Sequence, residues 1–230
     1  MKIAVIPARG GSKRIPGKNI KNFYGKPVIS YSVMAAQEAG LFDHVIGSTD
    51  DEEIAGIARE YGAEVPFMRP AELADDYTGT GDVVRHALEW YVSQGEKVAY
   101  ACCIYATSPL LHHKYLVEGF EKLAGSGKSF SFSVTSFPFP IQRAIRINKN
   151  GEIEAIWPEN IKARSQDLEE AYHDAGQFYW GHAEAFLNDE VVFSRASLPI
   201  IIPRHRVQDI DTPEDWHRAE LMYKAIEVKD

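Results

Sequence analysis

Four cationic side chains fall within ten residues near the start of the sequence, in the segment ARGGSKRIPGKN. They are Arg9, Lys13, Arg14 and Lys18. Glycines and a serine lie between them, and glycines let a backbone approach a ligand closely and present its N–H groups to phosphate oxygens. The segment matches neither G-x-x-x-x-G-K-[ST] nor G-x-G-x-x-G. We therefore predict a phosphate-binding loop of another pattern, with a solvated basic turn as the alternative.

A pair of carboxylates far along the chain could hold a metal ion. Asp209 and Asp211 are separated by one residue in the extended segment VQDIDT, so their side chains share a face. Two like charges on one face repel each other unless a cation lies between them, and magnesium commonly bridges carboxylates and substrate phosphates. Thr212 and Pro213 then have the types expected at the cap and first residue of a helix. The spacing alone leaves a metal site and a plain carboxylate pair equally open.

The elements that must position these groups alternate between strand and helix patterns. A buried strand over residues 2–7 leads into the basic loop, and ligands of open α/β sheets bind beyond the carboxyl ends of the strands. Asp82 is a candidate helix cap. Further strands are predicted over 44–50, 63–67 and 97–106, and helices over 28–39, 52–61, 83–94 and 115–124. This alternation predicts an α/β fold, with a mostly parallel mixed sheet and helices on both faces.

The segment over about 137–168 breaks that rhythm. It follows SFSFSVTSF, which alternates with a period of two, and it contains RAIRINKNGEIEAIW, which predicts a hairpin around Asn150 and Gly151. Its apolar residues have few partners nearby in sequence. We predict one domain over 1–230 with an inserted β-arm that packs on a second copy of the chain, and an ordinary surface hairpin is the alternative.

The composition excludes several classes of protein. The chain has 230 residues and a net charge of −8, which argues against a nucleic-acid-binding surface. No stretch approaches the ~20 apolar residues of a membrane span, and the first apolar run is too short for a secretory signal. Cys102 and Cys103 are adjacent, so on a strand they point to opposite faces and suit neither a disulfide nor a metal pair. We expect a soluble, cytoplasmic protein.

Six segments together resemble a known family across nearly the whole chain. They are IPARGGSKRIPGKN, STDDEEIA, RPAELADD, ATSPL, YHDAG and QDIDT. In this order and spacing they resemble the sugar-acid cytidylyltransferases, which include the CMP–sialic acid synthetases. The resemblance implies a Rossmann-like nucleotidyltransferase fold and a homodimer with an exchanged arm. It also implies a magnesium-dependent reaction, in which the C2 hydroxyl of a 2-keto sugar acid attacks the α-phosphorus of CTP and pyrophosphate leaves.

The resemblance also assigns roles residue by residue. The nucleotide-binding positions are Ala8, Arg9, Ser12, Asn19, Arg69 and Thr80. Thr80 stands where a relative has serine. The catalytic positions are Arg9, Lys13, Lys18, Asp209 and Asp211, and the last two match the magnesium-binding pair. No residue is identified as a general base.

The choice of sugar acid rests on the positions where the chain departs from the sialic acid enzymes. YHDAG stands where those enzymes commonly read like FRPNG, and Tyr105 stands where they have glutamine. RSQDL at 164–168, YHDAG and ACCIY instead resemble the pseudaminic acid cytidylyltransferases. The predicted sugar-binding residues are Tyr105, Arg164, His173, Asp174 and Gln177. Arg164 would suit a substrate carboxylate but could equally bind its own arm, and His173 could be a plain strand histidine.

Three alternative functions remain. A CMP–sialic acid or CMP–octulosonate synthetase would use the same loop and the same aspartates. A catalytically silent nucleotide-binding module would share the fold, although the complete set of cations and both aspartates argue against it. A nicotinamide oxidoreductase is disfavoured because the glycine fingerprint is missing.

Overall fold

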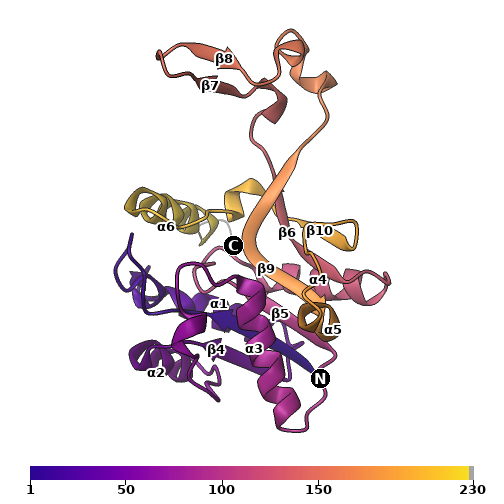
Figure 1. The fold of residues 1–230 in the computed structure, drawn as a ribbon. Helices are drawn as coiled ribbons and strands as arrows, with labels where there is room; N and C mark the ends of the chain where they lie inside the picture. The colour runs from indigo at the N-terminus through magenta and orange to yellow at the C-terminus, as the bar shows by residue number, and fades with distance from the viewer. Residues whose placement is uncertain (228–230) are drawn as a thin grey trace.

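A six-stranded sheet forms the centre of the computed structural model, which describes residues 1–227 (Figure 1). Its strand order is β10-β6-β9-β5-β1-β4. The strands are β1 (Lys2–Pro7), β4 (His44–Ser48), β5 (Tyr100–Ile104), β6 (Phe130–Ser136), β9 (Tyr172–His182) and β10 (Ser197–Ile201). β1 runs parallel to β4 and β5, and β10 runs parallel to β6. β9 is antiparallel to both β5 and β6, because the chain leaves the sheet along β6 and returns along β9. The predicted mostly parallel mixed sheet is confirmed.

Helices cover both faces of this sheet. The longer elements are α1 (Val28–Glu38), α2 (Glu52–Glu60), α3 (Thr80–Ser93), α4 (His113–Ala124), α5 (Ala183–Leu187) and α6 (Pro213–Glu227). Residues of α1, α2 and α4 share one buried cluster with the sheet, and residues of α3 and α5 share the other. Cys102 belongs to the first cluster and Cys103 to the second, and both thiols are free, as their adjacency on a strand predicted.

A third buried cluster joins segments that are far apart in sequence. Ile15 of the basic loop and Ile210, between the two aspartates, pack there with Phe23 and with Trp216 of α6. The aromatic rings of Phe23 and Trp216 meet edge to face, with centroids 5.5 Å apart. This packing holds the basic loop and the aspartate segment beside each other, so the third cluster positions the candidate site.

Some predicted boundaries were wrong. α3 begins at Thr80 rather than at residue 83, so Asp82 lies in its first turn and pairs with Arg85 at 3.0 Å instead of capping the helix. The strand predicted over 63–67 is reduced to a single bridge between Ile46 and Glu64. The remaining short elements are β2 (Asn22–Phe23), β3 (Lys26–Pro27) and 3-10 turns at Lys18–Ile20, Ala71–Leu73, Ile141–Arg143, Pro158–Asn160, Ser165–Asp167 and Arg204–Arg206.

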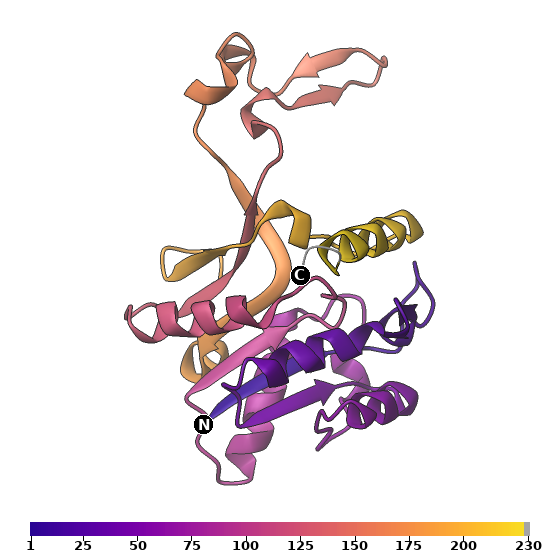
Figure 2. The same ribbon diagram turned by 180° about the vertical axis from the view of Figure 1, so that it is seen from behind.

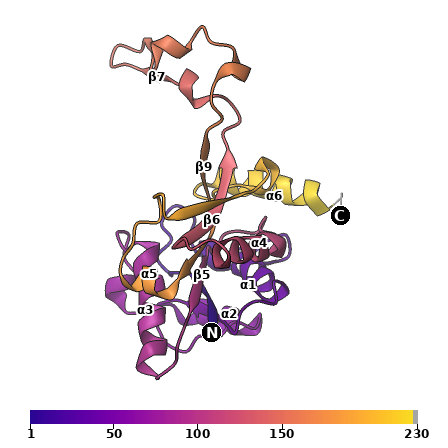
Figure 3. The same cartoon turned by 90° about the vertical axis from the view of Figure 1, so that its right-hand side faces the viewer.

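The segment between β6 and β9 extends away from the rest of the chain as an arm, which Figure 2 and Figure 3 show from two further sides. It carries the antiparallel pair β7 (Ile145–Ile147) and β8 (Ile153–Ala155). The predicted hairpin is confirmed: Gly151 adopts a left-handed φ of 81° in its turn. Large apolar side chains on the arm are exposed, including Phe139 at 79% and Ile147 at 74%. The role of the arm in dimerisation stays a prediction.

Candidate active site

The basic loop after β1 and the start of α3 line a cavity of about 300 Å³, called here the nucleotide cavity. Nearly all residues predicted to hold the nucleotide line it, namely Arg9, Ser12, Lys13, Lys18, Asn19, Arg69 and Thr80. They come from three separate segments: the loop after β1, the segment after Met68 and the first turn of α3. Ala8 is the exception, because it is buried and its N–H donates to the Ser48 carbonyl at 2.9 Å.

Local hydrogen bonds fix the path of the basic loop. The Asn19 amide donates to the Arg9 carbonyl at 2.9 Å, and the Gly10 N–H donates to the Asp50 carboxylate at 3.0 Å. Gly17 adopts a left-handed φ of 60°, which a side chain would strain. Asn19 therefore already has a structural role in shaping the loop, beside its predicted contact with the nucleotide.

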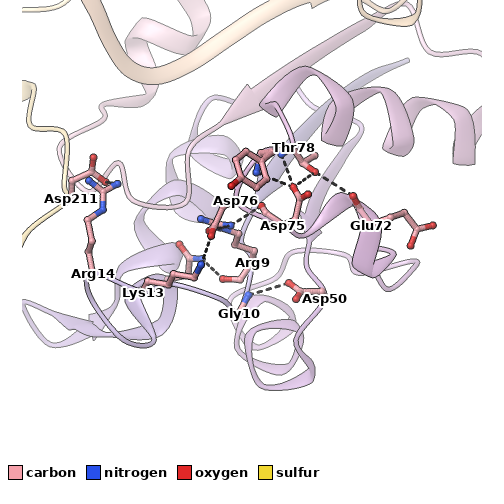
Figure 4. Close-up of polar contacts among 12 residues, drawn as sticks. Arg9, Gly10, Lys13, Arg14, Asp50, Glu72, Asp75, Asp76, Thr78 and Asp211 are labelled. Atoms are coloured by element: carbon pink, nitrogen blue, oxygen red, sulfur yellow. Dashed lines mark hydrogen bonds and ion pairs between the residues drawn. The ribbon is translucent and has the colours of Figure 1, made fainter.

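Two carboxylates form ion pairs with cations of this loop, as Figure 4 shows. Asp76 pairs with Lys13 and, at 2.7 Å, with Arg9, whose guanidinium also donates to the Asp75 carbonyl at 2.6 Å. Asp211 pairs with Arg14 at 2.9 Å. Hydrogen bonds from Lys13 and then Arg9 hold the pKa of Asp76 below its usual range. The sequence prediction gave Asp76 no role, although RPAELADD was one of the segments that carried the family resemblance.

Arg69 is a buried cation that faces this cavity. Its residue is 6% exposed, and within residues 1–227 neither its Nε nor one of its terminal nitrogens has a hydrogen-bond partner. The nearest carboxylate, Asp50, lies 3.8 Å away. Burial lowers the pKa of Arg69, and Asp50 partly opposes that shift. A buried guanidinium with unpaired N–H groups is suited to bind carbonyl or phosphate oxygens of a ligand.

The two aspartates of QDID have different surroundings. Asp211 contacts the basic loop, since Lys18 lies 3.5 Å from its carboxylate and Arg14 lies closer. The Asp209 carboxylate accepts no hydrogen bond within the part of the chain that the structure describes, and burial and then Asp211 raise its pKa. The predicted helix cap is confirmed, because the Thr212 hydroxyl accepts from the Asp215 N–H at 3.2 Å and the Asp215 carboxylate accepts from Thr212 in return.

The aspartate pair is the only acidic group that the prediction offered for a metal. Among residues 1–227, no cluster of three or more His, Cys, Asp or Glu side chains could hold a metal ion by itself. A metal between Asp209 and Asp211 would therefore take its other ligands from substrate oxygens or water, which is the usual arrangement for magnesium. The unpaired carboxylate of Asp209 and its raised pKa fit such a site.

A second cavity, of about 900 Å³, lies beside the first and is called here the sugar cavity. Tyr105, His173, Asp174 and Asp209 line it, and Tyr105 lines the nucleotide cavity as well. Its walls are the end of β6, the start of β9, the turn Arg204–Arg206 and α6. His173 is partly engaged already, because its Nδ1 lies 2.8 Å from the Asp174 carbonyl.

A pair of hydroxyl contacts connects the two cavities. The Thr80 hydroxyl lies 3.2 Å from the Tyr105 hydroxyl, and the Tyr179 hydroxyl donates to the Asp174 carboxylate. Burial raises the pKa of Tyr179, with Tyr105 and Asp174 as further causes, so Tyr179 remains a hydrogen-bond donor. Tyr179 was predicted to be a core residue of its strand and nothing more.

A third, apolar cavity of about 340 Å³ lies next to these hydroxyl contacts. Thr80, Tyr105, Asp174 and Tyr179 all line it. Its apolar wall consists of Val84, Phe186, Val192 and Phe193. The sequence prediction missed this wall, because the last two lie in a segment after α5 with no recognisable pattern.

The family comparison agrees with this geometry. The family model described as cytidylyltransferase matches residues 3–189. The chain belongs to the cytidylyltransferase family. It is 46% identical over 223 residues to the pseudaminic acid cytidylyltransferase of Campylobacter jejuni, a match that covers 97% of this chain and 96% of the relative. It is 30% identical over 230 residues to the CMP-N,N'-diacetyllegionaminic acid synthase of Legionella pneumophila, covering 96% of this chain and 95% of that one.

A solved structure supports the fold of this cytidylyltransferase. A CMP:2-keto-3-deoxy-manno-octonic acid synthetase in complex with CTP superposes with a TM-score of 0.70, and the match covers 98% of this chain and 99% of that chain. At 15% sequence identity, the likeness concerns the fold alone. Within residues 1–227 of the cytidylyltransferase, no helix is long and apolar enough to cross a membrane.

Two predicted sugar-binding residues of the cytidylyltransferase lie outside the sugar cavity. Arg164 is on the arm, where its guanidinium forms a double contact with Asp167 at 2.7 and 3.1 Å. Gln177 is 3% exposed, and its amide donates to the Arg206 carbonyl at 2.5 Å. Within a single chain, then, the structure brings Tyr105, His173 and Asp174 together and leaves Arg164 and Gln177 apart from them.

Proposed function

We propose that this protein transfers the cytidylyl group of CTP to a nine-carbon 2-keto sugar acid, pseudaminic acid, and releases pyrophosphate. The CMP-sugar would then serve the synthesis of surface glycans. The observation that carries this proposal is the cationic nucleotide cavity beside a larger polar cavity, with Tyr105 lining both. The similarity to the Campylobacter jejuni relative, over nearly the full length of both chains, supports the choice of sugar acid.

In this reaction the loop cations neutralise the charge of the triphosphate. Lys13 and Arg9 would stabilise the departing pyrophosphate once Asp76 has left them, and Lys18 would do so from beside Asp211. Arg69 and Thr80 line the cavity and would fix the nucleoside. The buried guanidinium of Arg69 has unpaired N–H groups that can donate to it. Two anionic substrates must be held together, so catalysis rests mainly on positioning and on charge neutralisation.

We propose magnesium as the cofactor, held by Asp209 and Asp211. A bound magnesium ion polarises a phosphate oxygen and lowers the pKa of a nearby hydroxyl. Asp211 would orient Lys18 and Arg14 next to that charge, and Asp209 would face the sugar acid.

The apolar cavity gives the sugar site a place for acyl groups. The methyl end of an acylamino group would lie against Val84, Phe186 and Phe193, and Tyr179 and Asp174 would offer polar partners at its entrance. A polar pocket discriminates between stereoisomers when hydrogen bonds are matched in one isomer and left unpaired in another.

We also propose a cytoplasmic homodimer assembled through the arm. The exposed apolar side chains of β7 and β8, among them Ile147 and Ile153, would be covered by the second copy. The buried free thiols of Cys102 and Cys103 agree with a reducing compartment. Sedimentation of the wild type and of Ile147→Glu tests this proposal: we expect a dimer and a monomer, and a monomeric wild type would contradict it.

The deciding experiment is a substrate panel. The protein is incubated with CTP, magnesium and, separately, pseudaminic acid, N-acetylneuraminic acid and an octulosonic acid, and the CMP product is identified by mass. We expect turnover with pseudaminic acid. Preferred conversion of either other acid would reassign the substrate. CTP binding by calorimetry without conversion of any acid would instead indicate a non-catalytic nucleotide-binding module.

A further inference from the structure

The sugar cavity contains two arginines that the sequence prediction did not consider. They are Arg204, from the turn Arg204–Arg206, and Arg218, from α6. Arg204 is already engaged, because its guanidinium donates to the Phe137 carbonyl at 3.3 Å. The carboxylates of Asp174 and Asp209 line the same cavity. An anionic ligand entering it therefore meets two like charges, and a cation that contacts the ligand directly would offset their repulsion.

Arg218 is placed to supply that cation. On α6, Trp216 and Ala219 face the third buried cluster, whereas Arg218 and Met222, one turn apart, face the sugar cavity. Within residues 1–227 the Arg218 guanidinium makes no hydrogen bond and no ion pair that would occupy it. Its influence on Asp215 is minor, since hydrogen bonding from Thr212 is the main cause that lowers the pKa of Asp215 and Arg218 contributes least.

We propose that Arg218 binds the carboxylate of the sugar acid through a two-pronged ion pair; this inference rests on the proposed function. The carboxylate of a 2-keto acid is attached to the carbon that bears the reacting hydroxyl, so it must lie close to the aspartate pair. Asp209 lines the sugar cavity together with Arg218. The guanidinium fork matches a carboxylate in shape and charge. Arg164, the earlier candidate, is held by Asp167 on the arm.

This contact would orient the attacking hydroxyl. With the carboxylate fixed on α6 and the body of the sugar against the end of β6 and the start of β9, the C2 hydroxyl would face the nucleotide cavity at Tyr105. Arg218 would act on the sugar acid alone, because it does not line the nucleotide cavity. A substitution of Arg218 should therefore change the KM for the sugar acid and leave the KM for CTP unchanged, and steady-state kinetics can measure both.

The test compares Arg218→Gln and Arg218→Lys with Lys224→Gln, a matched change of an exposed cation on the same helix. We expect Arg218→Gln to raise the KM for the sugar acid about 10- to 100-fold and to leave the KM for CTP unchanged. Arg218→Lys should recover part of the loss, because the charge remains and the fork does not. Lys224→Gln should behave as the wild type. Thermal unfolding of each variant shows whether the fold is intact.

A substrate analogue provides the second arm of the test. The wild type should prefer the sugar acid over its C1 carboxamide, and Arg218→Gln should lose most of that preference. An unchanged KM for the sugar acid in Arg218→Gln would overturn the proposal, and so would an equal rise for both substrates. If the wild type converted no sugar acid, the proposed function would fail. Calorimetric binding of the acid and the amide to both proteins would still decide the role of Arg218.

Discussion

The nucleotide cavity and the sugar cavity differ in how far their charged side chains are paired within the protein. In the nucleotide cavity, Arg9 and Lys13 are paired with Asp76, a carboxylate of the protein itself. In the sugar cavity, the Asp209 carboxylate and the Arg218 guanidinium have no hydrogen-bond or ion-pair partner within residues 1–227. The exposed cations of the nucleotide cavity are therefore neutralised without a ligand, whereas these two charged groups of the sugar cavity are not. Buried Arg69 is the exception in the nucleotide cavity, because it keeps unpaired N–H groups.

The difference has a physical reason. A triphosphate carries several charges, so it can displace a single carboxylate from exposed cations at little cost. A sugar acid carries one carboxylate and many hydroxyls, and it binds best where partners already stand unpaired. The nucleotide cavity is therefore suited to exchange the Asp76 carboxylate for a triphosphate. The sugar cavity is suited to select a sugar acid by its stereochemistry.

The largest effect is expected at Asp211, which pairs with Arg14 and Lys18 of the basic loop. Asp211→Asn removes the negative charge of a proposed magnesium ligand that also pairs with Arg14, and turnover should fall more than about 1,000-fold. Chelation of the metal in the wild type should have the same effect. Pyrophosphate release measures both. Glu214→Gln, three residues along the chain and exposed, serves as the control, and near-normal turnover in Asp211→Asn would remove the metal assignment.

A large effect is also expected at Lys13. Lys13→Ala should remove about 3 kcal/mol of transition-state stabilisation, which corresponds to a loss of roughly 100-fold in kcat/KM. The loss should appear in kcat/KM for both substrates, because the pyrophosphate is stabilised as it leaves. Lys97→Ala, an exposed lysine at the opposite end of the sheet, should have no effect. An unchanged rate in Lys13→Ala would mean that the triphosphate lies elsewhere.

A moderate effect confined to the sugar acid is expected at Tyr179. Tyr179→Phe removes the hydroxyl that donates to the half-buried Asp174 carboxylate, and an acceptor left without its partner costs about 1 to 3 kcal/mol. The KM for the sugar acid should rise by about tenfold, and the KM for CTP should not change. An equal rise in the KM for CTP would show that the two cavities are not separate sites, and the contrast between them would then be wrong.

The two cavities also differ in how far they could be predicted from the sequence. The loop at 8–19 and the QDID pair are local patterns whose chemistry follows from a few adjacent residues, and the structure places both segments beside one cavity. The sheet and its helices were predicted because apolar periodicity is also local. The start of α3 was missed because Gly79 and Thr80 resemble a loop, although Gly79 is the residue before the first turn.

The sugar cavity could not be predicted in this way, because it is assembled by tertiary structure. Tyr105 follows β5, Asp174 lies near the start of β9 and Arg218 lies on α6, so no window of sequence contains them together. Arg164 was proposed from its motif, but the arm moves it away from the other candidates within one chain. Arg218 occupies a helix position that resembles any exposed arginine until Met222 and the cavity are seen beside it.

The smallest effect, and the one that most directly tests the contrast, is expected at Asp76. Asp76→Asn keeps the size of the side chain but removes the charge that competes with the triphosphate for Arg9 and Lys13. CTP should bind a few-fold more tightly, as measured by calorimetry, because exposed ion pairs contribute little. Hydrogen bonds from Lys13 and then Arg9 lower the pKa of Asp76, so its carboxylate stays ionised to a lower pH than that of an ordinary aspartate, and the gain should be constant across neutral pH. It should shrink only in acid, as protonation of the wild-type carboxylate also releases the two cations. Weaker CTP binding in Asp76→Asn would show that Asp76 positions Arg9 and Lys13 for the phosphates, and the nucleotide cavity would then be preorganised by its own carboxylate.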